Sequence, residues 1–120
     1  MATKPMYSFQ YRTPRFPTDF PVDLVVGDTT FRGRCNNING SGIQAEFTNP
    51  AVVGQVGMLT LNHTKDAMKL YARVTYFASW QTGLAFVFRT EHERGQLLRF
   101  VESLCGPHIG QNTRRTMQPR

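Results

Sequence analysis

MKLYARVTYFASWQTGLAFVF, residues 68–88, alternates apolar and polar side chains on both sides of a short turn. In the first run, one side carries Met68, Leu70, Ala72, Val74 and Tyr76. Residues 79–82 predict the turn, and Leu84, Phe86 and Phe88 then supply the inward side of a second run. Alternation with a period of two is typical of strands with one buried face, so the stretch predicts a β-hairpin at the edge of a core.

The same pattern extends toward the N-terminus. Strands are predicted over residues 22–26, 29–37, 43–47 and 56–62, and the turn signals between them are Gly27-Asp28, Asn39-Gly40 and Asn49-Pro50. Six short strands with tight connections predict a mainly β domain, an antiparallel barrel or a sandwich.

One helix is expected after the strands. Thr90 and Glu93 have the spacing of a capping box, and Gly106-Pro107 provides the stop. Between them, apolar side chains recur at helical spacing: Leu97, Leu98, Val101 and Leu104. This stripe predicts one helix face packed on the sheet.

Charge and length limit the classes of function. The 120 residues suffice for one domain, and the net charge of +6 divides into +3 within residues 1–15, +3 within 106–120 and none over the body between. A groove-wide nucleic-acid binder spreads its Lys and Arg over the folded body, so a nucleic-acid polymer is not the expected ligand.

No apolar run has the length of a membrane span, and the N-terminus lacks the apolar stretch of a secretory signal. We therefore expect a cytoplasmic protein without membrane insertion.

Little in the sequence indicates catalysis. His63, His92 and His108 fall in a turn, a helix cap and the tail, without a nucleophile or carboxylates at ligand spacing. Cys35 and Cys105 match no metal-ligand spacing, and Cys35 falls on an apolar strand face. No glycine-rich loop opens a helix. We expect neither an enzyme nor a bound metal or cofactor.

Two polar segments stand out. Tyr11-Arg12-Thr13-Pro14-Arg15-Phe16-Pro17 precedes the first strand, and Asn37-Ile38-Asn39-Gly40-Ser41-Gly42 ends the second. Arginine offers a planar fork of donors that suits a phosphate or the edge of guanine, and asparagine both donates and accepts. Together with the strand pattern over residues 10–104, these segments resemble the PilZ family of cyclic di-GMP receptors, which combine an RxxxR motif on an N-terminal arm with (D/N)xSxxG on the barrel.

The resemblance implies a six-stranded antiparallel β-barrel with a C-terminal helix and flexible termini. It divides the chain into an arm (residues 1–20), the barrel with its helix (21–105) and a basic tail (106–120). Cyclic di-GMP is then the ligand, bound by Arg12, Arg15, Asn37, Asn39 and Gly42, with Tyr11, Ser41 and Trp80 as further candidates. We expect the arm to close over the barrel on binding and to relay the signal to an unidentified partner controlling motility, adhesion or secretion.

Two positions depart from the family pattern and motivate an alternative. Tyr11 stands where the first arginine of RxxxR would be, with Arg12 one residue later, and Asn39 replaces serine. The alternative is an adaptor of the same family that has lost the nucleotide and acts through protein contacts. A third hypothesis is an oligonucleotide-binding barrel, which requires stacked aromatic side chains on a basic face. The formal charge of the body between residues 15 and 106 is zero, which argues against this hypothesis.

Overall fold

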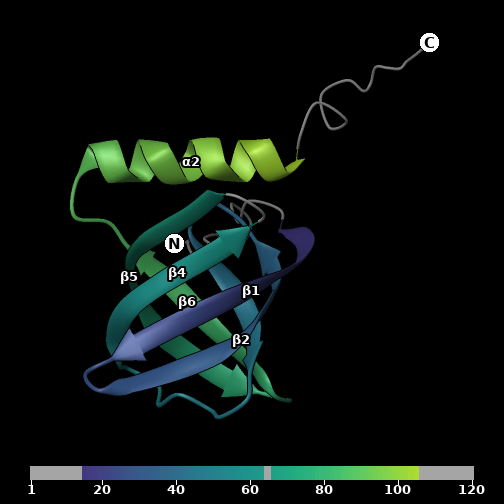
Figure 1. Ribbon diagram of the computed structural model, residues 1–120, viewed down its shortest axis with the longest axis vertical. Coiled ribbons are helices and arrows are strands. Elements are labelled where there is room, and N and C mark those ends of the chain that lie inside the picture. Colours follow the sequence, from purple (N-terminus) through teal and green to yellow (C-terminus); the bar gives the residue numbers. More distant parts are fainter. Residues whose placement is uncertain (1–14, 64–65, 106–120) are drawn as a thin grey trace, which may run out of the picture.

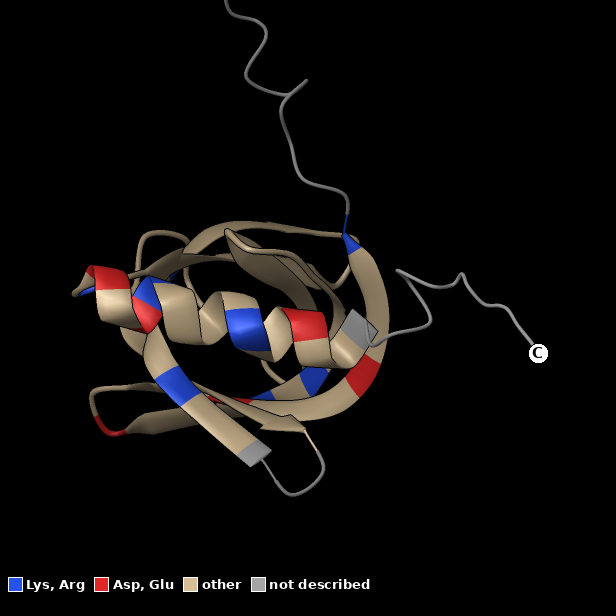
Figure 2. Ribbon diagram, turned by 90° about the horizontal axis from the view of Figure 1, so that it is seen from above, with Lys and Arg blue, Asp and Glu red and all other residues tan. Residues whose placement is uncertain are grey.

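Six antiparallel strands and one helix make up the part of the chain that the computed structural model describes, residues 15–63 and 66–105 (Figure 1). The elements are β1 Phe16–Val26, β2 Thr29–Ile38, β3 Gly42–Phe47, β4 Val56–His63, β5 Asp66–Ala78, β6 Gln81–Val87 and α2 Glu91–Cys105. The strands close into a barrel in the order β1-β2-β3-β6-β5-β4, and α2 lies across one end of it (Figures 1 and 2). The predicted barrel with a C-terminal helix is confirmed.

The barrel interior holds the apolar side of every strand. Its fully buried members include Val22, Leu24, Ile38, Ile43, Leu59, Leu61, Leu70 and Val74. Each such side chain contributes roughly 1.5–3 kcal/mol through its removal from water. The strand alternation seen in the sequence therefore identifies the side chains that fill the barrel, which the pairing of β1 with β4 closes.

β1 is longer than expected at its start. It begins at Phe16 rather than Val22, so the residues from Phe16 onward that were assigned to the arm belong to the barrel. Its β4 partners are confined to Val22–Val25, so the half containing Pro17 and Pro21 pairs with β2 alone. Proline is tolerated where a strand is paired on one side only, because its missing N–H then breaks no ladder bond. Residues 1–14 and 106–120, the rest of the predicted arm and the predicted tail, lie outside the described residues.

The cap of α2 differs from the predicted capping box in one bond. The Glu93 backbone N–H donates to Thr90 Oγ1 at 3.0 Å, as the box requires. The Glu93 carboxylate accepts from the backbone N–H of Arg89 (2.8 Å) and from its guanidinium (2.7 Å) instead of from Thr90. The hydrogen bonds from the Arg89 guanidinium and backbone N–H lower the pKa of Glu93. In the first turn of α2, the Glu93 N–H is therefore partnered, and an acidic side chain lies near the positive end of the helix.

The helix face that meets the barrel is shifted relative to the prediction. Leu97 and Val101 are buried as expected, whereas Leu98 is 44% exposed and is not part of the core. Phe100 packs in its place, with its ring 6.2 Å from the rings of both Phe20 and His63. None of the described helices is long and apolar enough to cross a membrane.

Candidate functional site

Arg15 and Asn37, predicted from separate motifs, are in contact. Arg15 stands immediately before β1, and its Nη1 donates a hydrogen bond to Asn37 Oδ1, near the end of β2, at 3.1 Å. Because β1 and β2 are antiparallel, Pro17 lies opposite Asn37, and Arg15, two residues before Pro17, is therefore close to the Asn37 side chain. The side-chain contact is on the outside of the barrel, where a ligand could reach both groups. Arg12 and Tyr11 lie outside the described residues.

A β-bulge turns Asn37 outward. Cys35 pairs with Ala45 and Asn37 pairs with the next residue back, Gln44, so β2 holds one extra residue there. A bulge of this kind breaks the alternation of faces and re-aims the side chains that follow. Asn36 and Asn37 consequently both present their amides to neighbouring strands from the outer surface of the barrel.

From Asn37 a chain of amide hydrogen bonds crosses the sheet. Asn37 Nδ2 donates to Gln44 Oε1 on β3 at 2.7 Å, and Gln44 Nε2 donates to Tyr76 Oη on β5 at 2.6 Å. Gly83 on β6 separates Gln44 from Tyr76 in the register, and the Tyr76 ring occupies the space that a Cβ on Gly83 would need. The glycine thus lets the tyrosine lie across β6.

Gln44 and Tyr76 were not predicted as site residues, and Tyr76 was assigned to the inward side of its strand. That assignment is wrong. A bulge between Val74 and Tyr76 adds one residue to β5, and Tyr76 is 39% exposed. The only signals for these two residues were a polar side chain on an outward strand position and a glycine at position 83.

A second polar run lies beside the first. Asn36 Nδ2 donates to Gln81 Oε1 at 2.6 Å, and Gln81 Nε2 donates to the Glu46 carboxylate at 3.2 Å. The outer surface of β2, β3 and β6 therefore offers amides, one carboxylate and the Arg15 guanidinium. Such a surface suits a flat ligand with several donors and acceptors and an anionic part.

Asn39, Ser41 and Gly42 form the turn between β2 and β3. Asn39 is 1% exposed, and its Oδ1 accepts from Ser41 N, Ser41 Oγ and Gly42 N at 2.8, 2.9 and 3.1 Å. Gly42 is buried, and a Cβ there would overlap the carbonyl oxygen of Leu84 on β6. Gly42 therefore permits close strand pairing, and the Asn39 oxygen holds the turn. Ser41 remains exposed at its tip.

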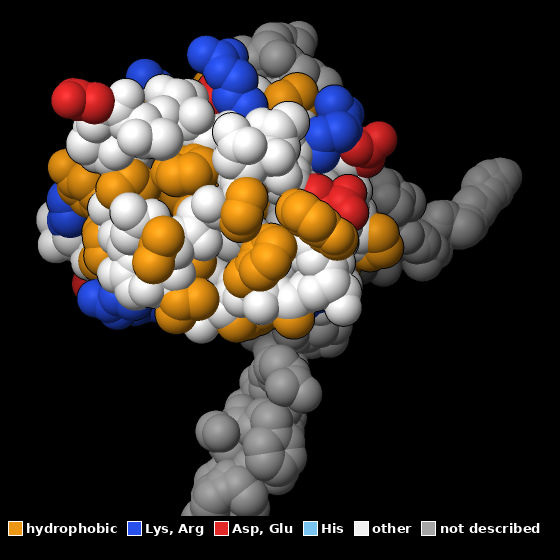
Figure 3. All heavy atoms as spheres, turned by 90° about the horizontal axis from the view of Figure 1, so that it is seen from below, with side chains coloured by type: hydrophobic (Ala, Val, Ile, Leu, Met, Phe, Trp, Pro, Cys, Tyr) orange, Lys and Arg blue, Asp and Glu red, His pale blue; other side chains and the backbone are white. Residues whose placement is uncertain are grey.

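Trp80, the last of the predicted candidates, is not brought together with Arg15. It lies at the tip of the β5–β6 hairpin, at the barrel end opposite α2, where Ser79 and Trp80 have φ of 53° and 65°. Its ring meets that of Phe77 edge-on, with centroids 5.7 Å apart. Figure 3 shows hydrophobic side chains gathered over this end of the barrel.

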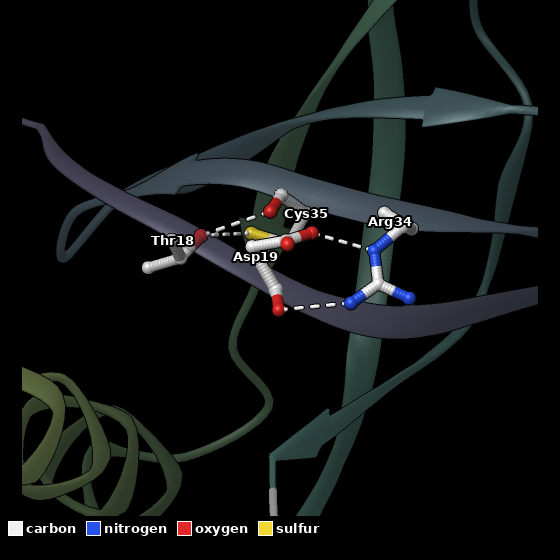
Figure 4. A network of polar contacts seen from close by, with 4 residues as sticks. All are labelled: Thr18, Asp19, Arg34 and Cys35. Carbon is white, nitrogen blue, oxygen red and sulfur yellow. Dashed lines mark hydrogen bonds and ion pairs between the residues drawn. The ribbon is translucent and has the colours of Figure 1, made fainter.

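Beneath the site, Cys35 and Thr18 fasten β1 to β2 (Figure 4). The Thr18 hydroxyl lies 3.0 Å from the Cys35 carbonyl oxygen and 3.2 Å from its Sγ, and the thiol donates to the Asn37 carbonyl at 3.3 Å. Burial raises the pKa of Cys35 to about 11, against the opposing effect of the Thr18 hydrogen bond. Cys35 is thus a structural thiol, as predicted, and its bonds hold the bulge that exposes Asn37.

An ion pair on the outer surface reinforces the same two strands. Arg34 Nε contacts the Asp19 carboxylate, and Arg34 Nη2 donates to the Asp19 backbone carbonyl at 3.0 Å (Figure 4). Both side chains are well exposed, so the pair contributes little to stability and mainly sets the local geometry. Within the described part of the chain, no three His, Cys, Asp or Glu side chains gather into a metal-binding group.

The closed barrel thus carries a guanidinium and a row of amides on its outer face. The family model for the PilZ domain matches residues 10–103, and this chain belongs to the PilZ domain family. No curated protein matches it.

Solved structures share the fold at low sequence identity. The PilZ domain of CeSA from a cellulose-synthesizing bacterium has a TM-score of 0.66 and 14% identity, over 77% of this chain and 98% of that one. The PilZ domain of YcgR from Escherichia coli, solved with c-di-GMP, gives 0.68 and 15% over 86% and 98%. PlzA of Borreliella burgdorferi, solved in complex with c-di-GMP, gives 0.56 and 16% over 93% and 58%.

Proposed function

We propose that this domain binds cyclic di-GMP on the outer face of β2, β3 and β6, beside Arg15. The observation that carries the proposal is the 3.1 Å hydrogen bond between Arg15 and Asn37, which joins the two polar segments singled out in the sequence. Membership of the PilZ family supports it, as do the YcgR and PlzA structures that hold this nucleotide.

Each group has a role that follows from its chemistry. The Arg15 guanidinium would meet a phosphate or the O6/N7 edge of guanine, forming charge-assisted hydrogen bonds of roughly 1.5–3 kcal/mol each. Asn37 and Gln44 would exchange their present bonds for bonds to the base or ribose, and the Tyr76 ring offers a surface for stacking. Arg12 would add a second cation from the segment before the barrel.

Calorimetric titration with cyclic di-GMP tests the proposal. Wild-type protein should give saturating heat at micromolar nucleotide, and Arg15→Ala should weaken binding roughly ten- to hundredfold through the lost charge-assisted bonds. Arg32→Ala is the matched control, because Arg32 is also an exposed arginine on the barrel but lies at another part of β2. An Arg15→Ala affinity equal to that of Arg32→Ala would remove Arg15 from the site.

Signal relay forms the second part of the proposal. On binding, the segment before Phe16 would close over the nucleotide and present a new surface to a cytoplasmic partner in motility, adhesion or secretion. A receptor of this kind performs no catalysis. Backbone NMR tests the step, since the amides of residues 2–13 should change their shifts and relaxation at saturating nucleotide. Identical spectra with and without nucleotide would refute the switch.

A second candidate function is an adaptor of the same family that does not bind the nucleotide. The buried Asn39 favours it, because the side chain at the position of the motif serine is occupied in holding the turn. The same titration separates the two functions. Absence of heat up to millimolar cyclic di-GMP would leave the adaptor as the function of this domain.

A further inference from the structure

A groove of about 630 Å³ runs between α2 and β5, away from the Arg15 contact. The residues that line it include Met68 and Lys69 on β5 and Gln96, Arg99, Phe100 and Ser103 on α2. None of these residues takes part in the amide row or in the β2–β3 turn. The groove is therefore a separate surface that the proposed nucleotide site does not use.

One face of α2 lines this groove. Gln96, Arg99, Phe100 and Ser103 recur at the spacing that places residues on one side of a helix. This face lies beside the one that Leu97 and Val101 bury against the barrel. One face of α2 therefore packs on the barrel, and the neighbouring face lines the groove.

The floor of the groove is apolar and firmly held. Met68 and Phe100 are half-buried and pack against the barrel core. The Phe100 ring also stands nearly perpendicular to Phe20 and His63, at 83° and 85°. An apolar side chain from a partner could cover this floor without rearranging it.

The rim of the groove is cationic. Lys69 and Arg99 approach from different elements, and no carboxylate is among the residues that line the groove. Neither forms an ion pair with the described side chains of residues 15–63 and 67–104, whereas Arg89 and Arg94 of the same region pair with Glu93 and Glu91. The two cations therefore remain available to an incoming anionic group.

We infer that this groove binds an acidic segment of a partner protein. Carboxylates of the segment pair with Lys69 and Arg99, while an apolar residue between them packs on Met68 and Phe100. A small inorganic anion would leave that apolar floor uncovered. The chain's own residues 106–120 carry three arginines and no acid, so like charge excludes them as the occupant. The bound segment would contact α2 and β5 at the same time.

A charge-swap experiment on the full chain tests the inference, in the absence of nucleotide so that it stands apart from cyclic di-GMP binding. The probe is a short fluorescein-labelled peptide of alternating glutamate and leucine, paired with its lysine–leucine counterpart. Wild-type protein should bind the acidic peptide saturably. The double variant Lys69→Glu/Arg99→Glu should lose roughly tenfold or more in affinity for it and should gain binding of the basic peptide.

The matched control is Arg32→Glu/Arg73→Glu, which makes the same change in net charge at exposed positions outside the groove. This control should keep its affinity for the acidic peptide within about threefold of wild type. An equal loss in both double variants would show general electrostatic attraction and overturn the inference, as would absence of saturable binding to wild type up to millimolar peptide. If the double reversal unfolds the protein, Arg99→Gln, with wild-type circular dichroism as its control, should still weaken the acidic peptide.

Discussion

Replacing Asn39 with alanine should destabilise the barrel, because this side chain holds the β2–β3 turn from inside. Its Oδ1 accepts from the backbone N–H groups of Ser41 and Gly42 at 2.8 and 3.1 Å. Ser41 is exposed, so water can replace its lost partner, whereas the bond to Gly42 is buried. An orphaned buried donor costs about 1–3 kcal/mol, so we expect a loss of roughly 2 kcal/mol in the free energy of unfolding.

The size of the effect makes it measurable. At roughly 4–8 °C per kcal/mol for a domain of this size, Asn39→Ala should melt roughly 8–16 °C below wild type. Urea unfolding should show the same loss as a lower midpoint with an unchanged slope. Asn39→Ser, which restores the residue of the family motif and keeps an acceptor oxygen, should lose less than the alanine variant.

Asn49→Ala serves as the control, since Asn49 is an exposed asparagine in the loop after β3 and should change stability by less than about 0.5 kcal/mol. An Asn39→Ala variant as stable as this control would refute the structural role assigned to the side chain. Titration of Asn39→Ser with cyclic di-GMP would then show whether the position matters to the ligand instead.

Two further predictions concern stability. Gly95→Ala should raise the free energy of unfolding, measured by urea titration, by about 0.5–1 kcal/mol, because Gly95 lies inside α2. A Cβ at this position would meet only Arg99 Nη1, at an ordinary contact distance of 3.6 Å. A variant less stable than wild type would contradict this account of the helix. Burial raises the pKa of Cys35 from 9.0 to about 11, so between these pH values the folded protein keeps the protonated thiol while the unfolded chain ionises. The buried thiol therefore contributes about 2–3 kcal/mol to the free energy of unfolding below pH 9, and this contribution should be lost as the pH rises to 11. The free energy of unfolding of wild type relative to Cys35→Ser should fall by that amount over this range, and a constant difference would refute the buried thiol.

Much of the fold could be predicted because alternation and turn chemistry act locally. The barrel strands keep their apolar side over stretches such as Val22–Leu24 and Leu70–Val74, and Gly27 turns the first hairpin with φ of +60°. Residues with these local preferences carry the same signal wherever they are placed in a sheet. The Thr90 cap is likewise local and was found from its spacing.

Bulges account for the main errors on the sheet. An extra residue leaves no mark in composition, yet it exchanges the two faces of a strand from that point on. For this reason Tyr76, next in the alternation after Val74, was assigned to the core but lies outside it. The long β1 was missed for a different reason, since Pro17 and Pro21 are read as breakers unless one knows that the strand is unpaired on one side there.

The bulges also explain why the candidate site lies where it does. Asn37, Gln44, Gly83 and Tyr76 form one row across β2, β3, β6 and β5 in the register. Strict alternation would have turned Asn37 and Tyr76 inward, and burying an amide and a phenol there would require partners inside an apolar core. One extra residue in β2 and one in β5 bring both ends of the row to the outer face, where Gly83, which has no Cβ, makes room for the Tyr76 ring. The polar row is therefore a product of the irregular registers, and removing either bulge should abolish it.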